Sequence, residues 1–252
     1  MFYNICFSPT GGTQKVADIL ANECAEKKTV VDLTDRKLNF GSISLSGDDV
    51  ALIAVPSYSG RVPAVAVKRI AAINGNGAKA VLVCVYGNRA YEDTLTELRD
   101  TAAKAGFRVI ASVAAVAEHS ILQNYASGRP DEADRKQLTD FAEQIRGKLL
   151  SGNTTEPNIP GNRPYRKISA TGMIPKATRA CTNCGLCARK CLVDAINGND
   201  LRHTDRETCI SCMRCVSICP QKARKVSPIL LFLGRIMLSK ACSKRKENEL
   251  YL

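Results

Sequence analysis

The chain has 252 residues, of which 45% are hydrophobic, so it is long enough for one or two domains with buried cores. Its net charge of +12 is concentrated in one half: residues 1–150 carry 18 Lys and Arg against 17 Asp and Glu, whereas residues 151–252 carry 18 against 7. Such a basic half favours an acidic protein partner, an anionic membrane surface or an anionic substrate. The aromatic content of 5% and the lack of a recognised binding motif argue against nucleic acid as a partner.

The first residues, MFYNICFSPTGG, contain no basic segment followed by a long apolar core, so we expect no signal peptide and a cytoplasmic location. Five short apolar segments are then predicted to be strands, at residues 2–7, 29–33, 50–55, 79–87 and 108–116. Helical patterns occupy residues 14–27, 62–73, 88–106 and 129–150. Apolar strands that alternate with helices predict an α/β fold for residues 1–150, with a five-stranded parallel sheet covered on both faces.

The loop between the first strand and the first helix has a composition that suits a phosphate group. Its hydroxyls and adjacent glycines let the backbone approach an anion at a helix start, although glycine turns are also common without any ligand. Because it directly follows the first strand, this loop resembles the FMN-phosphate loop of flavodoxins, whose pattern is matched by Ser8, Thr10, Gly11, Gly12 and Thr13. Gly12 departs from the Asn that is common there.

This resemblance implies the doubly wound strand order 2-1-3-4-5, with FMN at the carboxyl ends of the strands. The loops that would hold its ring comprise Pro56, Ser57, Tyr58, Ser59, Gly60 and Arg61 after the third strand, and Tyr86, Gly87, Asn88, Arg89, Ala90 and Tyr91 after the fourth. Tyr58 and Tyr91 are the candidates for stacking on the ring, the alternative being packing within each loop. Arg61 and Arg89 are predicted to make the mouth of this site basic, unless both are solvated.

His119 follows the fifth strand on the same side of the sheet. A surface or capping role is favoured for it over proton delivery to the flavin. Residues 151–175 are rich in Pro and Gly, which excludes a helix or a central strand. They are predicted to be a linker, either a tether or a packed extended arm, and the basic NRPYRK segment within it could dock on the first domain.

Eight of the twelve cysteines lie in two runs with the spacing C-x2-C-x2-C-x3-C, within a small α+β domain predicted over residues 176–226. This spacing is typical of proteins with two [4Fe–4S] clusters, in which the last Cys of each run ligates the cluster of the other run. It predicts one cluster on Cys181, Cys184, Cys187 and Cys219, and a second on Cys191, Cys209, Cys212 and Cys215. Zinc binding or a disulfide framework are the alternatives.

The segment from Cys181 to Pro220 resembles a bacterial two-cluster ferredoxin, except that Leu192 follows the first run where the pattern has Pro. The whole chain resembles flavodoxin-ferredoxin fusion proteins, which are known from anaerobic microbes. That resemblance implies an electron-transfer protein in which single electrons pass between the clusters and FMN. The alternative is a flavin-dependent reductase of a small, anionic substrate that is fed by its own ferredoxin domain.

Residues 227–252 are predicted to be a separate apolar and basic tail. Its segment Ile229 to Leu238 is too short to cross a membrane, since a membrane span needs about 20 residues. A helix packed on the protein or on a partner is expected, with a helix lying on a membrane surface as the alternative. Cys242 is expected to be a free thiol.

Overall fold

The computed structural model describes residues 1–168 and 172–252, so residues 169–171 of the predicted linker lie outside the described residues. Five parallel strands form the centre of the main sheet in the order β2-β1-β3-β4-β5, which is the flavodoxin-like doubly wound order. Their bounds are Phe2–Cys6 (β1), Thr29–Asp32 (β2), Val50–Pro56 (β3), Lys79–Tyr86 (β4) and Arg108–Val116 (β5). The predicted α/β fold is therefore confirmed.

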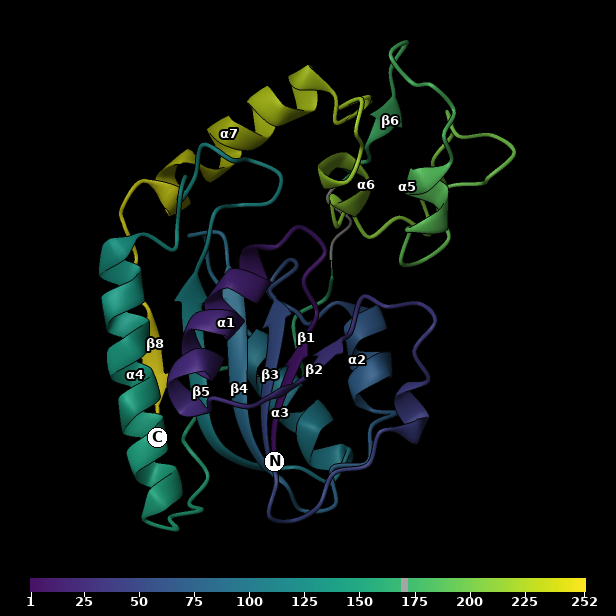
Figure 1. Cartoon of the computed structure of the whole chain (residues 1–252). Coiled ribbons are helices and arrows are strands. Elements are labelled where there is room, and N and C mark those ends of the chain that lie inside the picture. The colour runs from purple at the N-terminus through teal and green to yellow at the C-terminus, as the bar shows by residue number, and fades with distance from the viewer. Residues whose placement is uncertain (169–171) are drawn as a thin grey trace.

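Two pairs of helices cover the two faces of this sheet (Figure 1). On one face α1 (Gly12–Cys24) and α4 (Glu132–Leu150) pack on Phe2, Cys6 and other buried residues. On the other face α2 (Ala64–Ile70) and α3 (Thr94–Lys104) pack on Tyr3, Ile5 and their neighbours. This alternation along β1 follows from the two-residue period of a strand. A short 3-10 helix, η1 (Phe40–Ser42), lies between β2 and β3.

Three predicted helices begin later than their sequence pattern indicated, and the one predicted from residue 62 begins at Ala64. The helix predicted from residue 88 begins at Thr94, because residues 87–93 form a loop instead. The helix predicted from residue 129 begins at Glu132, where Asp131 accepts a hydrogen bond from the backbone N–H of Asp134 and Asp134 returns one. That reciprocal arrangement is a capping box, which satisfies N–H groups at the helix start.

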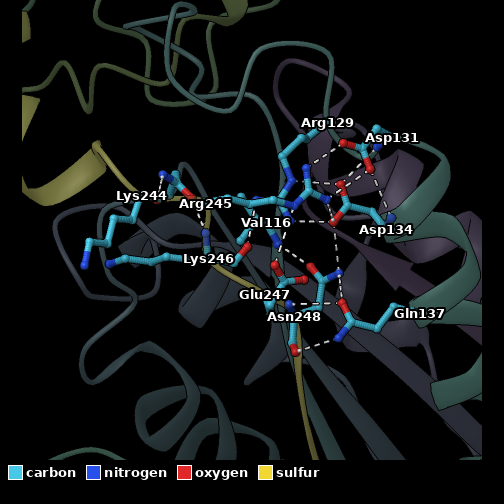
Figure 2. A network of polar contacts seen from close by, with 11 residues as sticks. Val116, Arg129, Asp131, Asp134, Gln137, Lys244, Arg245, Lys246, Glu247 and Asn248 are labelled. Atoms are coloured by element: carbon cyan, nitrogen blue, oxygen red, sulfur yellow. Dashed lines mark hydrogen bonds and ion pairs between the residues drawn. The ribbon is translucent and has the colours of Figure 1, made fainter.

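A sixth strand, β8 (Glu249–Tyr251), pairs antiparallel with β5 and closes that edge of the sheet. The predicted separate tail is therefore wrong for its last residues, which belong to the main sheet. A network of polar contacts holds this segment in place (Figure 2). The Asn248 side chain accepts from the backbone N–H of Val116 at 2.9 Å and donates to Gln137 at 2.8 Å and Asp134 at 3.1 Å.

Asp134 also forms an ion pair with Arg129, and the two side chains are 0% and 4% exposed. Burial alone would raise the pKa of Asp134, but hydrogen bonds from Arg129 and from the backbone of Asp131 outweigh burial and lower it. Arg129 donates in addition to the Lys246 carbonyl at 2.8 Å. A buried carboxylate of α4 thus fixes the C-terminal segment through its charged partner.

The cysteine-rich segment forms a small module at the carboxyl ends of the strands (Figure 1). It contains the paired strands β6 (Lys176–Ala177) and β7 (Arg224–Lys225) and the short helices α5 (Leu186–Arg189) and α6 (Arg214–Ser217). Leu192, Val193 and Cys212 pack against the core on the α2 and α3 side of the sheet. An ion pair between Arg36 and Asp194, at 2.6 Å, adds a polar contact between module and sheet domain.

The described part of the linker is a packed arm along α3. Asp100 of that helix accepts from Arg163 at 2.7 Å and from the Tyr165 hydroxyl. Asp93, just before the helix, accepts from the backbone N–H groups of Asn162 at 2.8 Å and Arg166 at 2.7 Å. The NRPYRK segment therefore docks on the first domain, as one of the predicted alternatives had it.

Helix α7 (Pro228–Cys242) runs from the module back to the sheet domain, above the loop that follows β5 (Figure 1). Gly234 lies against Leu122 of that loop, and the Tyr125 hydroxyl donates to the Arg235 carbonyl at 2.6 Å. The opposite face exposes six large apolar side chains, those of Ile229, Leu230, Phe232, Leu233, Ile236 and Met237. None of the helices in the described ranges combines the length and apolarity needed to span a bilayer.

Candidate functional site

The loop before α1 offers unpaired backbone donors at a helix start. Gly11 has a φ of 93°, a left-handed conformation that favours glycine, and α1 begins at the next residue. The Ser8 hydroxyl accepts from the backbone N–H of Gln14 at 3.0 Å. Within the described chain, the N–H groups of residues 10–13 donate no hydrogen bond. Four free N–H groups beside the positive end of a 13-residue helix fit a phosphate group.

The loop after β3 is a tight turn that α3 holds in place. Tyr58 and Arg61 exchange backbone hydrogen bonds of 2.9 and 3.1 Å. Ser57 contacts Thr94 of α3 through their hydroxyls, 2.7 Å apart. Glu97 of α3 accepts from Arg61 Nε and Nη2, each at 2.7 Å, and from the Val62 backbone N–H at 2.8 Å. Sequence patterns did not reveal Glu97, because nothing in a helix sequence indicates which loop it will face.

These contacts show that the two arginines at the mouth of the predicted flavin site are paired with carboxylates. The charge of Arg61 is paired with that of Glu97, and the two side chains are only 17% and 10% exposed. Arg89 is paired with Glu92, with one hydrogen bond of 2.8 Å between them. Neither guanidinium is the unpaired cation that an anionic substrate would need.

Tyr58 lies where the sheet domain meets the cysteine-rich module. Burial raises the pKa of its phenol well above the ordinary value, and the nearby Cys212 sulfur raises it further. Cys212 itself packs against the core of the sheet domain. Tyr58 therefore stands at the predicted flavin loop and close to a predicted cluster ligand at the same time.

The loop after β4 is engaged by the C-terminal segment. The Asn88 side chain donates to the Cys242 and Lys244 carbonyls at 3.1 and 2.9 Å and accepts from the Lys246 N–H at 3.1 Å. The Tyr91 ring packs on Tyr86 with centroids 5.2 Å apart. Its hydroxyl lies 2.7 Å from that of Tyr251. Tyr91 thus contacts Tyr86 and the C-terminal strand, and stacking on the ring stays a prediction for both Tyr58 and Tyr91.

His119 packs directly on Gly87, where an added Cβ would come within 2.7 Å of the imidazole. Its Nδ1 accepts from the backbone N–H groups of Ile121 and Leu122, both at 3.2 Å. Burial lowers the pKa of His119, and the charge of Arg89 lowers it further. A neutral imidazole that accepts hydrogen bonds from two N–H groups of the loop fits the predicted capping role.

The eight cysteines of the two runs line two separate cavities. The first cavity is bounded by Cys181, Cys184, Cys187 and Cys219. The second is bounded by Cys191, Cys209, Cys212 and Cys215. This grouping is that of the two predicted ligand sets, each of which takes its fourth cysteine from the other run. Four thiols around one space fit the four corners of an iron–sulfur cubane.

The environment of these thiols bears on metal binding. Burial raises the pKa of Cys212 to about 12 and that of Cys215 to about 11. Thiolates there need a compensating positive charge, which bound iron provides. Cys219 differs, because backbone N–H groups, including that of Ala223 at 3.3 Å, outweigh burial and lower its pKa.

Comparison with known proteins supports one of these assignments directly. Residues 180–224 match the family model of a 4Fe–4S dicluster domain. No curated protein matches the chain.

Solved structures resemble the sheet domain. A flavodoxin of Streptococcus pneumoniae is 21% identical, with 59% of this chain and 99% of that chain covered and a TM-score of 0.42. Oxidised flavodoxin 1 of Bacillus cereus is 16% identical, with 57% and 95% covered and a TM-score of 0.43. Two-electron reduced flavodoxin of Megasphaera elsdenii is 16% identical, with 57% and 99% covered and a TM-score of 0.37. These scores are low, so the fold assignment depends on the strand order described above.

Proposed function

We propose that this chain, in which a flavodoxin-like fold is joined to a 4Fe–4S dicluster domain, passes single electrons between two [4Fe–4S] clusters and FMN. The observation that carries the proposal is the position of the second cysteine cavity. Cys212 of that cavity packs on the sheet domain near Tyr58, at the edge where the phosphate-type loop also lies. When bound, clusters exchange one electron at a time and a flavin exchanges one or two.

The residues of the chain bind the FMN and the two clusters and set the distances between them. The free N–H groups of residues 10–13 bind the FMN phosphate, and the turn held by Glu97 supports the ring with Tyr58 beside it. The second cavity is the one next to this loop, and the first lies further along the module, with Cys184 exposed. This order makes the first cavity the entry point for a partner and the second the link to the flavin.

An acidic redox partner fits the surroundings of the first cavity. Arg179, Arg189 and Lys190 are exposed in the segments that carry its cysteines. The half of the chain that holds both cavities carries +11 of the net charge of +12. Docking through such charges is steered electrostatically, so the rate of electron transfer with the partner falls as salt is added.

The reductase alternative has less support in this geometry. It drew on Arg61 and Arg89 as free cations for an anionic substrate, and both are paired with carboxylates. We therefore favour electron transfer between proteins over reduction of a small anion.

Anaerobic purification with iron, sulfide and flavin quantified per chain tests the proposal. About eight iron atoms and one FMN per chain are expected; one or two zinc ions with no flavin would refute it. Thr10→Asp places a negative charge beside the free N–H groups at an exposed position, so it should weaken FMN binding at least tenfold and leave iron unchanged. Thr155→Asp, at an exposed position of the arm, is the matched control and should bind FMN normally.

A further inference from the structure

A buried arginine lies between the two cysteine cavities without a carboxylate partner. Arg224 of β7 is 1% exposed. Its Nη1 donates to the Leu201 carbonyl at 2.7 Å, and its Nη2 donates to the Pro175 carbonyl at 3.0 Å and to the Thr204 hydroxyl. All three acceptors are neutral. Among the described residues no ion pair with a carboxylate involves Arg224, and its Nε has no hydrogen-bond partner.

The residues that line the two cysteine cavities place the positive charge of Arg224 beside both of them. Arg224 and Leu201 line the first cavity, while Pro175 and Thr204 line the second. No Asp or Glu occurs in the sequence between Glu207 and Glu247. An isolated buried cation is strongly disfavoured unless a negative charge compensates it. The thiolate-bound clusters are the negative charges that these two cavities would hold.

The internal repeat shows that this position does not require a charge for packing. Arg224 follows Cys219 by five residues, and Ile196 follows Cys191 by five residues. Each is preceded by a buried alanine, Ala223 and Ala195. Ile196 is 5% exposed and lines the second cavity, as Arg224 lines the first. The second run therefore has a cation where the first run has an aliphatic side chain.

We propose that Arg224 raises the reduction potentials of both clusters, the one held by Cys181, Cys184, Cys187 and Cys219 and the one held by Cys191, Cys209, Cys212 and Cys215. This inference rests on the clusters of the proposed function. Reduction adds one electron, supplied in the test by dithionite, and no proton, so the charge of a cluster with its thiolates goes from about −2 to about −3. A fixed buried cation stabilises the more negative form, and little solvent screens the interaction.

Titration of the cluster potentials followed by electron paramagnetic resonance tests this role. In Arg224→Ile, which copies the first run, we expect eight iron atoms per chain. At a fixed solution potential, the ratio of reduced to oxidised first cluster should fall at least about tenfold, equivalent to about 59 mV for a one-electron couple. Arg224→Lys should keep potentials near those of the wild type. Lys225→Ile removes the same charge from the exposed neighbouring residue and should change the ratio less than twofold.

The outcomes separate this inference from the proposed function. If the cluster reduction potentials in Arg224→Ile equal those in Lys225→Ile, the inference about Arg224 is overturned. If Arg224→Ile does not retain iron, Arg224→Gln is titrated in its place, and loss of iron in both would also overturn it, because the cation would then serve assembly. Zinc in the wild-type chain would refute the clusters themselves, whereas absence of FMN would leave this inference standing.

Discussion

Glu97 is the carboxylate on which the conformation of the loop after β3 depends. Replacing it by Gln keeps the shape of the side chain and one acceptor oxygen, which can still accept from Arg61 Nε and the Val62 N–H. The amide nitrogen then faces Arg61 Nη2, a donor opposite a donor, at the site of the present 2.7 Å contact. Arg61 retains the Arg166 carbonyl at 2.7 Å and the Tyr165 ring at 4.8 Å.

The magnitude follows from these contacts. One charge-assisted hydrogen bond is lost, worth about 1.5–3 kcal/mol, and the two others become weaker. Because both side chains are mostly buried, solvent recovers little of this loss. We expect the free energy of unfolding to fall by about 2–3 kcal/mol, which moves the urea midpoint down by about 1 M.

Urea unfolding of the loaded protein, followed by far-ultraviolet circular dichroism under anaerobic conditions, measures this change. FMN affinity should fall as well, because the loop that supports the ring becomes less ordered. Glu143→Gln removes the same charge from an exposed position of α4 and should change the free energy of unfolding by less than about 0.5 kcal/mol. If Glu97→Gln has the same midpoint as this control, the reasoning about the loop is wrong.

Three further predictions concern residues 228–252, which contain helix α7 and strand β8. Asn248→Ala leaves the buried Val116 N–H without an acceptor at a cost of about 2 kcal/mol, so hydrogen exchange of residues 249–251 should become about 30-fold faster. Arg245 and the Asp134 backbone N–H hold the pKa of Asp131 below its ordinary value, and the pKa of Asp134 is lowered too. These carboxylates therefore stabilise the segment above about pH 4, and protection of residues 249–251 should fall as the pH decreases below that value. Finally, the exposed apolar face of α7 lies in a stretch, residues 208–246, with nine Lys and Arg and no acidic residue. Anionic lipid vesicles should bind the chain, and Phe232→Ser with Ile236→Ser should reduce the bound fraction several-fold.

Each of these has a clear contrary result. Exchange in Asn248→Ala equal to that in Asn158→Ala, at an exposed position of the arm, would show that the amide contacts do not anchor the strand. Protection that is constant from pH 6 to pH 3 would mean that the aspartates do not contribute. Equal binding of the double serine variant and the wild type, or binding to an acidic protein but to no vesicle, would exclude α7 as a lipid-binding surface.

Much of this molecule is encoded in local sequence patterns. Continuous apolar segments predicted β1 to β5 because a strand covered on both faces must be apolar throughout, and the observed bounds differ from the predicted ones by at most one residue. Cysteine spacing predicted which four thiols share a cavity: the first three cysteines of each run, spaced three residues apart, are held together by a short length of backbone, and the pattern of two-cluster proteins assigns the last cysteine of each run to the other cavity. The loop at Ser8 to Thr13 was recognisable because helix-start geometry is also a local property.

The tertiary structure decided which distant partners meet. Tyr91 and Tyr251 are 160 residues apart, and Asn88 and Cys242 are 154 apart, so no local period could predict either contact. A three-residue strand such as β8 carries too short a pattern to be recognised, and it forms only because β5 offers an open edge. Arg61 was expected to be a free cation and is paired, whereas Arg224 received no assignment and is a buried charge without a carboxylate partner among the described residues. The sequence specifies which residues are charged, but the pairing and burial of each charge depend on which elements the fold brings together.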